Sequence, residues 1–408
     1  MTKDKIRQIL EDTAYIRTGG SAEELRCAEY IQNTCKEMGM DAYLEEFEVD
    51  MADVKKAVLT VDGEEIPCIG YLCAGSGVVE APFYYMPSDD KYSLSLCKGK
   101  IVMIEGYIRH WMYQDMLAAG AVGFITYSGD ANYADEEIDT RELRQAVSLG
   151  KKIPGVNINA KQAIRLVEKD SKMARIELEQ EEYKGKSHNV IVDLPGEVEE
   201  TIVFTAHYDS TALSQGVYDN MSGSVGILGI AEYFTTHPHK YSLRFVWCGS
   251  EERGLLGSKA YVAGHEDILD KIIFNINLDM IGSTMGRFIG VCTTEDKLVS
   301  YLKYYSDIEG FPMGVRQEVY SSDSTPFADK GVPALSFARI APHNTATIHN
   351  SYDTIAVMKM EHMEKDIAFI TKFSDVMANA VRLPVDRKIP DNMKEKLDIY
   401  LLRKRDEK

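Results

Sequence analysis

The sequence predicts an α/β fold with a mixed, mostly parallel sheet that is covered by helices on both faces. From residue 187 onward, continuous apolar runs alternate with helical patterns. Such runs are typical of parallel strands that are buried on both faces, and the helices between them supply the crossovers. The stretch 55–183 has a different sequence pattern, with short β-rich runs and one obvious helix at 112–119. We therefore expect an inserted, β-rich domain in this stretch.

The first fifty residues are predicted to form two helices and a strand. Ser21 and Glu24 have the spacing of a capping box, and apolar residues then recur at helical spacing until Gly39 ends the run. A strand is expected at 43–49. The chain thus divides into four predicted segments: 1–54 and 184–390 as the two parts of one main domain, 55–183 as the insert, and 391–408 as a C-terminal amphipathic helix or tail.

The main domain after the insert is predicted to alternate between strands and helices. Strands are expected at 189–194, 201–206, 243–248, 272–278 and 332–337. Helices are expected at 222–234, 254–263 and 357–381. This order is the pattern of a parallel, helix-covered sheet.

Composition and charge narrow the classes of function. The chain has 408 residues, of which 45% are hydrophobic and 27% charged, a balance that is typical of folded domains. A net charge of −18 argues against nucleic acid or a membrane as a partner. No apolar run reaches the ~18 residues of a membrane span, and the N-terminus lacks a secretory signal, so we expect a cytoplasmic protein. The seven cysteines include no C-x-x-C pair and are predicted to be reduced core thiols.

Polar residues of metal-ligand types follow the predicted strands. In an open α/β sheet the ligand crevice lies outside the carboxyl ends of the strands. His207 follows strand 201–206, and Asp209 comes two residues later, where its carboxylate can orient the imidazole. Asp219 precedes a helix, a position where an ordinary helix cap is the alternative interpretation. Asp279 follows strand 272–278.

Two further segments complete this set of residues. Glu251 and Glu252 follow strand 243–248, and adjacent carboxylates near a core need a cation to coexist. Consecutive side chains in an extended segment point to opposite sides, so one Glu can bind metal while the other faces substrate. Far downstream, His349 is a second imidazole, with Asp353 as its possible partner.

Two histidines and three carboxylates are thus candidate ligands, and one carboxylate is left over as a base. Mixed imidazole and carboxylate ligation suits zinc, with Co²⁺ or Mn²⁺ as possible substitutes. Five protein ligands are too many for one tetrahedral catalytic zinc, which typically takes three and a water. They suit two ions that share one carboxylate.

In this combination of motifs the chain resembles the bimetallic zinc aminopeptidases of the aminopeptidase Y and aminopeptidase S type. The family pattern is H-x-D, D-N, E-E, N-x-D-M and H-x-x-x-D-T. This sequence has each motif in order, at His207/Asp209, Asp219-Asn220, Glu251-Glu252, Asn277 to Met280, and His349/Asp353-Thr354. The stretch 55–183 resembles the protease-associated domain, on the runs KGKIVMIEG, MLAAGAVGFITYS and KKIPGVNINAKQAIRLV.

The resemblance implies a phosphorylase/hydrolase-like zinc exopeptidase fold with two Zn²⁺ per chain. One ion would be held by His207, Asp219 and Asp279, and the other by Asp219, Glu252 and His349. Asp219 would bridge the two ions. The segments 1–54 and 184–390 would form the zinc peptidase domain.

The resemblance also implies the remaining roles. Glu251 would be the general base, and Asp209 would be the partner of His207. The peptide bond between Asp219 and Asn220 would be cis. The substrates would be peptides with a free N-terminus, which the acidic cluster would attract.

The sequence departs from some relatives at one position and leaves alternatives open. Ile348 stands where these relatives have a tyrosine as oxyanion donor, and Tyr352 is one candidate to replace it. A carboxypeptidase of the same clan would need a cation for the substrate carboxylate, which Arg316 or Arg339 could supply. A glutaminyl cyclase-like transferase and a binding protein on an inactive peptidase fold are disfavoured, because the D-N pair and the complete ligand set are present.

Overall fold

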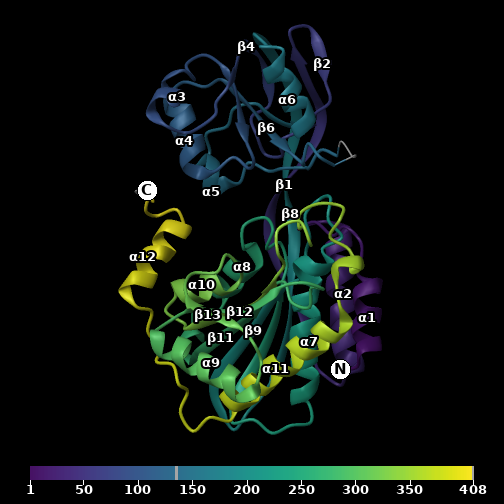
Figure 1. Cartoon of the computed structure of the whole chain (residues 1–408), viewed down its shortest axis with the longest axis vertical. Helices are drawn as coiled ribbons and strands as arrows, with labels where there is room; N and C mark the ends of the chain where they lie inside the picture. Colours follow the sequence, from purple (N-terminus) through teal and green to yellow (C-terminus); the bar gives the residue numbers. More distant parts are fainter. Residues whose placement is uncertain (134–136, 407–408) are drawn as a thin grey trace. The chain divides into compact units, whose positions relative to one another are not determined.

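The computed structural model describes residues 1–133 and 137–406, so residues 134–136 of the predicted insert and 407–408 of the predicted tail lie outside the described residues. The chain divides into two units, one made of residues 1–49 together with 186 onward, and one of residues 50–185 (Figure 1). Two long strands, β1 (Ala42–Val61) and β8 (Met173–Leu194), contain the positions where the chain passes from one unit to the other. The predicted boundaries at 55 and 183 fall inside these strands, because a strand that continues across a boundary carries no break in composition.

The larger unit is built on a mixed, mostly parallel sheet, as predicted. In order across the sheet the strands are β13 (Gly314–Gln317), β12 (Arg287–Thr293), β14 (Ala334–Ile340), β11 (Ile272–Leu278), β9 (Val198–His207), β10 (Tyr241–Cys248) and the C-terminal part of β8, and β8 also pairs with β1. The pairs β10–β9, β9–β11, β11–β14 and β12–β13 are parallel. The pairs β8–β10 and β12–β14 are antiparallel.

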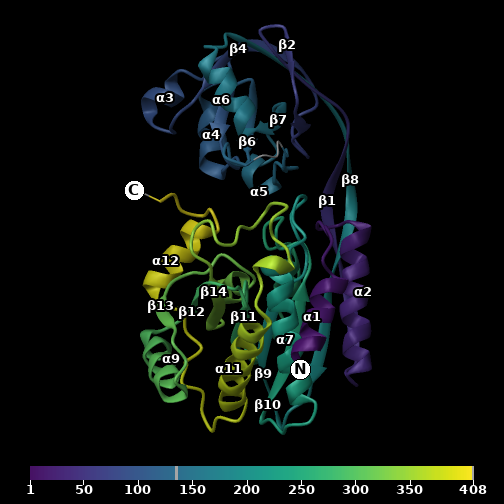
Figure 2. The same ribbon diagram turned by 45° about the vertical axis from the view of Figure 1, so that its right-hand side comes forward.

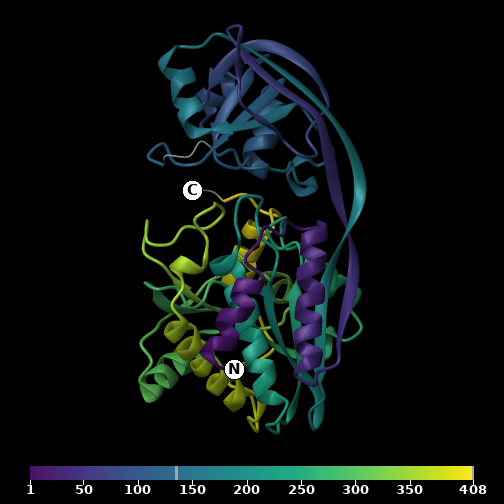
Figure 3. The ribbon, with the colours of Figure 1, turned by 90° about the vertical axis from the view of Figure 1, so that its right-hand side faces the viewer.

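Helices cover both faces of this sheet, and the alternation of side chains along each strand explains how. Ile202 and Phe204 of β9 belong to one core cluster and Val203 to another, since neighbouring side chains of a strand point to opposite faces. The first core includes residues of α1 (Lys3–Asp12), α2 (Ala22–Glu37), α7 (Ser222–Phe234), α9 (Asp296–Glu309) and α11 (Met360–Ala378) (Figure 2). The second includes residues of α8 (Leu256–Gly264) and α10 (Ser324–Asp329). Figure 3 shows α1 and α2 in front of the sheet of this unit.

The smaller unit has its own parallel sheet and its own core. Its parallel strands are β4 (Gly77–Tyr85), β5 (Ile101–Glu105), β6 (Gly123–Ser128) and β7 (Gly155–Asn159). The antiparallel partners are β8 on β4, β3 (Ile69–Gly70) on β7, and β2 (Glu64–Ile66) on β1. The helices are α3 (Lys91–Ser95), α4 (His110–Ala118), α5 (Gln145–Ser148) and α6 (Ala160–Glu168).

The one obvious helix of the sequence, 112–119, corresponds to α4, but three further helices in this stretch were not predicted. The missed helix α6 begins after Asn159, whose side chain accepts a hydrogen bond from the backbone of Lys161. Its buried residues Ala163 and Leu166 are three positions apart, which is a helical spacing. This helical spacing is visible in the sequence, but it follows directly on the apolar run of β7, so the helix was not distinguished from the strand.

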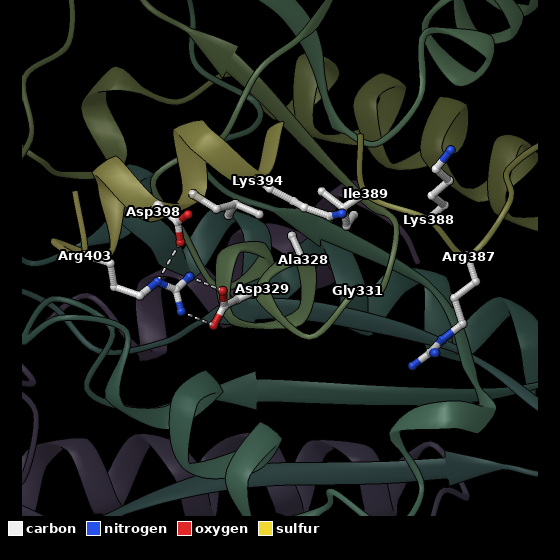
Figure 4. A pocket seen from close by; sticks show the side chains of 10 residues that line it. Ala328, Asp329, Gly331, Arg387, Lys388, Ile389, Lys394, Asp398 and Arg403 are labelled. Atoms are coloured by element: carbon white, nitrogen blue, oxygen red, sulfur yellow. Dashed lines mark hydrogen bonds and ion pairs between the residues drawn. The ribbon is translucent and has the colours of Figure 1, made fainter. Parts of the chain in front are cut away.

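The C-terminal segment packs on the larger unit through helix α12 (Asp391–Tyr400). Met393 and Leu397, four residues apart, are buried with Ala328 of α10. A pocket of about 560 Å³ lies beside this contact, and in it Arg403 pairs with Asp329 of α10 and with Asp398 of α12 (Figure 4). The acidic groups of this pocket are thus engaged in holding the C-terminal segment.

Two expectations from the composition can be compared with the described residues. All seven cysteines are free, and six of them are buried, with Cys68 half-buried. Among the described residues, no helix combines the length and the apolar character needed to cross a membrane. The remaining short elements are a π-helical turn at Val217–Met221 and 3-10 turns at Leu269–Lys271 and Ile355–Val357.

Candidate metal centre

Three parallel strands bring four of the predicted site residues together at the carboxyl ends of the strands. His207 is the last residue of β9, and it lies opposite Cys248, the last residue of β10. Glu251 and Glu252 follow β10 after a two-residue turn, and Asp279 follows β11 directly. Because β10, β9 and β11 are neighbours and parallel, their carboxyl ends meet at the same place.

The first cluster consists of His207, Asp219 and Asp279, all at most 6% exposed. Nε2 of His207 lies 3.2 Å from Oδ1 of Asp219 and 3.8 Å from Oδ1 of Asp279. One potential ligand atom from each residue lies within 4.8 Å of the others.

The second cluster shares Asp219 with the first and adds Glu252 and His349. Nε2 of His349 lies 3.1 Å from Oδ2 of Asp219 and 3.2 Å from Oε2 of Glu252. Asp219 therefore directs one carboxylate oxygen to each imidazole. A carboxylate in this position can bridge two cations.

The chemistry of the donors fits two divalent cations. Among the described residues, Oδ1 of Asp279 is buried without a hydrogen-bond partner, although it faces His207. Burial raises the pKa of Glu251 well above its ordinary value, and the neighbouring charge of Glu252 raises it further. Burial likewise raises the pKa of Glu252. Carboxylates that are so costly to ionise are stabilised when a cation lies between them.

Glu251 stands beside the two clusters rather than in them. Its Oε2 lies 3.9 Å from Nε2 of His207, and its side chain is 12% exposed. Its backbone N–H donates to Oδ1 of Asp209 at 2.9 Å, and that of Glu252 donates to Oδ2 at 3.1 Å. Oδ1 of Asp209 also lies 3.3 Å from Nδ1 of His207. Asp209 therefore faces the imidazole, as predicted, and also holds the loop of both glutamates, which the sequence did not reveal.

Asp353 has a different place from the one expected. Its carboxylate accepts hydrogen bonds from the backbone N–H of Tyr218 at 2.7 Å and of Asp219 at 3.1 Å, and from Oγ of Ser214 at 3.2 Å. The prediction that it partners His349 is wrong within the described residues. The segment from His349 to Asp353 forms bends and turns rather than a helix, so a spacing of four does not place the two side chains together.

The D-N pair fixes the geometry next to Asp219. The peptide bond between Asp219 and Asn220 is cis, as the resemblance implies. Nδ2 of Asn220 donates to the carbonyl of Leu278 at 2.9 Å, and its Oδ1 accepts from the backbone of Met280 at 2.9 Å. Asn220 thereby ties the start of α7 to both sides of Asp279.

Ile348, which stands in place of the tyrosine, and Tyr352, the candidate to replace it, lie in different surroundings. Ile348 packs on the main core and Tyr352 is 43% exposed. A phenol that the sequence did not single out, Tyr320, lies half-buried in the loop after β13. Burial raises its pKa well above its ordinary value, and the charges of Asp279 and Asp219 add to this effect.

Comparison with known proteins agrees with this picture. Residues 189–372 match the model of peptidase family M28. Aminopeptidase YwaD of Bacillus subtilis is 25% identical over 368 residues, which are 86% of this chain and 78% of that protein. The probable lipoprotein aminopeptidase LpqL of Mycobacterium tuberculosis is 27% identical over 294 residues, 68% of this chain. The match spans only 57% of the length of LpqL.

A solved structure shows the same fold. BSAP, a zinc aminopeptidase from Bacillus subtilis, superimposes with a TM-score of 0.77 at 24% identity, over 96% of this chain and 98% of that one. The family match extends from the end of β8 into α11 and so includes every strand end described above. Residues 189–372, which contain all the candidate ligands, are thus similar to peptidase family M28.

Proposed function

We propose that the chain is a zinc-dependent aminopeptidase that removes the N-terminal residue from peptides with the help of two Zn²⁺ ions. The observation that carries this proposal is the position of Asp219, whose two oxygens face two separate imidazoles, His207 and His349. The relatives YwaD and LpqL are named aminopeptidases, and BSAP is described as a zinc aminopeptidase.

The two clusters would hold the ions. His207, Asp219 and Asp279 would bind one, and Asp219, Glu252 and His349 the other. When bound, such a pair of cations lowers the pKa of a coordinated water and polarises the carbonyl of the substrate. Co²⁺ or Mn²⁺ would be a possible substitute, since both accept the same nitrogen and oxygen donors.

The chain itself would supply proton transfer and orientation. Glu251 is the one glutamate of the pair outside the clusters, so its carboxylate is free to take a proton from the attacking water and to return it to the leaving amine. Asp209 would keep the His207 ring and the Glu251 backbone in a fixed relation, since its oxygens face both.

The surroundings favour an aminopeptidase over a carboxypeptidase. The guanidinium of Arg339 is engaged with Asp366, at 2.8 Å for Nε, and with the carbonyl of Gly286 at 3.1 Å. Arg316 lies on the edge strand β13, three strands from β11, which at about 4.8 Å per strand is roughly 14 Å away. Neither arginine is placed to bind a substrate carboxylate, whereas the excess of carboxylates suits an α-ammonium group.

A substrate panel on zinc-loaded protein tests this function. We expect cleavage of peptides with a free N-terminus, loss of cleavage when the N-terminus is acetylated, and little effect when the C-terminus is amidated. Hydrolysis that requires a free C-terminal carboxylate would make the chain a carboxypeptidase. Elemental analysis should approach two zinc ions per chain, and saturation at one ion would favour a cyclase-like enzyme.

The remaining expectations extend this proposal. Seven free thiols suit a reducing compartment, so the protein would act in the cytoplasm, which cell fractionation would test. With a net charge of −18, its partners would be peptide substrates rather than nucleic acid or membranes. The unit of residues 50–185 would be a protease-associated domain.

A further inference from the structure

The first turn of α2 contains a fully buried carboxylate, Glu24, that the sequence analysis assigned to a helix cap. In a capping box its side chain would return to the backbone N–H of Ser21. That N–H instead donates to the carbonyl of Thr18, although Ser21 does cap the helix by accepting from the backbone of Glu24 at 3.1 Å. The Glu24 carboxylate is therefore available for other contacts.

Glu24 binds the loop that follows β10. Its Oε1 accepts from the backbone N–H of Ser250 at 2.8 Å, with the hydroxyls of Ser250 at 3.1 Å and of Ser187 at 2.8 Å. Its Oε2 accepts from the backbone of Gly20 at 2.6 Å. These donors are neutral, and the negative charge of Asp209 adds to burial in raising the pKa of Glu24 to about 8. Burying a carboxylate in such surroundings costs free energy, and its hydrogen bonds to the loop offset part of that cost.

Ser250 is the residue directly before Glu251. Its φ of +52° is in the left-handed region, which a residue with a side chain adopts only when its surroundings hold it there. Glu24 accepts its backbone N–H, and Asp209 accepts the next two, from Glu251 and Glu252. Two buried carboxylates thus fix three consecutive amides of the loop.

The contact between this turn and the loop leaves no free space. A Cβ atom on Gly19 would lie 2.3 Å from Oγ of Ser250, and one on Gly249 would lie 2.8 Å from Oε1 of Glu24. Nη1 of Arg253 donates to the carbonyl of Gly19 at 3.1 Å. The loop is therefore packed against the N-terminal turn on both sides of Ser250.

We propose that Glu24 is a positioning residue for hydrolysis, which fixes Ser250 and thereby places the carboxylate of Glu251 over the metal clusters. This inference rests on the proposed role of Glu251 as the base. It assigns a part in catalysis to the N-terminal helices, which lie outside the residues that match the family model.

A double-mutant cycle tests the proposal. We expect Glu24→Gln to lower kcat by about 10- to 100-fold, because a misplacement of 1 Å can cost about 10²-fold, with KM within about twofold of the wild type. Residues that act as a unit are non-additive, so Glu24→Gln should cost little more in a Glu251→Gln background. Independent, multiplying losses would overturn the inference. Normal turnover in Glu251→Gln alone would show instead that Glu251 is not the base. That result would refute the proposed role of Glu251 and is distinguishable from a failure of the inference about Glu24.

A measurement on metal-free protein gives a readout other than activity. In Glu24→Gln the amide NH₂ must face either the N–H of Gly20 or the donors of Ser250 and Ser187, so the hold on Ser250 weakens and the amide hydrogens of residues 250–252 should exchange at least about 10-fold faster. The matched control is Thr34→Val on the same helix, whose buried hydroxyl donates to the carbonyl of Tyr30 at 2.8 Å, and it should leave this exchange and kcat unchanged. Unchanged exchange in Glu24→Gln would contradict the proposal.

A second variant is used if Glu24→Gln does not fold. Gly19→Ala displaces Ser250 from the other side and leaves the Glu24 carboxylate intact. The same loss of kcat is expected, and it should again be absent in a Glu251→Gln background. A normal kcat for Gly19→Ala would show that the position of Ser250 does not matter.

Discussion

Buried side chains around the clusters accept backbone N–H groups next to the candidate ligands. Asp209 accepts those of Glu251 and Glu252, and Asp353 accepts those of Tyr218 and Asp219. The candidate ligands other than His349 could be identified from the sequence, because each follows a strand or precedes a helix. The partner of Asp353 was not, since in a turn the spacing of residues does not fix where a side chain points.

The adjacent glutamates allow metal binding and proton transfer to be separated. Glu251→Gln keeps the shape of the side chain and both clusters, so the metal content should stay while kcat falls by about 10²- to 10⁴-fold. Glu252→Gln replaces a charged ligand with a neutral amide and should lose zinc first. Elemental analysis and kcat of both variants decide the assignment. Near-normal turnover in Glu251→Gln would refute its role as the base.

Asp353 should control zinc affinity without touching the metal. In Asp353→Asn the amide NH₂ must face one of the N–H donors of Tyr218 or Asp219, so Asp219 loses its fixed position. We expect zinc affinity to fall by about 10- to 100-fold, the usual effect of removing a group that orients a ligand. Competition with a chelator of known affinity measures it. Asp391→Asn, at an exposed side chain, is the control, and equal affinities in both variants would count against this role.

At the scale of elements, strands and helices with an uninterrupted pattern were predicted well. The strand 272–278 and the helix 222–234 coincide with β11 and α7. The helix α9 was not predicted individually, and β1 is far longer than the predicted strand 43–49. A strand that extends beyond the main core alternates polar and apolar residues irregularly, so its length is not visible in the sequence.

The close approach of α7 to β11 depends on Gly223. A Cβ atom there would lie 2.3 Å from the carbonyl oxygen of Leu278 and 2.4 Å from Oδ1 of Asn220. Gly223→Ala should therefore destabilise the fold by about 1–3 kcal/mol, as overpacking does, and weaken zinc binding through Asn220. Gly264→Ala, at the end of α8 with open space around it, should be neutral or slightly stabilising. Denaturant unfolding of both variants makes the comparison, and equal stability would contradict the packing argument.

At the scale of the whole molecule, the two clusters of candidate ligands depend on segments far apart in the chain. Glu24 meets Ser250, and His207 meets Asp279, while residues 50–185 form a unit with its own core. The change in composition near residue 55 indicated an insert, and the order of the motifs indicated one site. Contacts between Glu24 and the loop after β10 could not be predicted, because they join residues separated by 226 positions.

This division predicts that zinc stabilises one unit and not the other. A ligand at 1,000 times its Kd stabilises the folded state by about 4 kcal/mol, which for a unit of this size is a shift in Tm on the order of 10 °C. The two tryptophans separate the units, because Trp247 is buried in β10 of the larger one and Trp111 lies in α4 of the smaller one.

Fluorescence melting of two single-tryptophan variants measures the effect. In Trp111→Phe, where Trp247 reports, chelation of zinc should lower Tm by this amount. In Trp247→Phe, where Trp111 reports, Tm should not change. Glu252→Gln in the Trp111→Phe background should show a smaller shift, because a ligand of one of the two candidate sites is removed. An equal shift at both tryptophans would mean that the units unfold together, and no shift at Trp247 would contradict zinc binding at the ends of β9, β10 and β11.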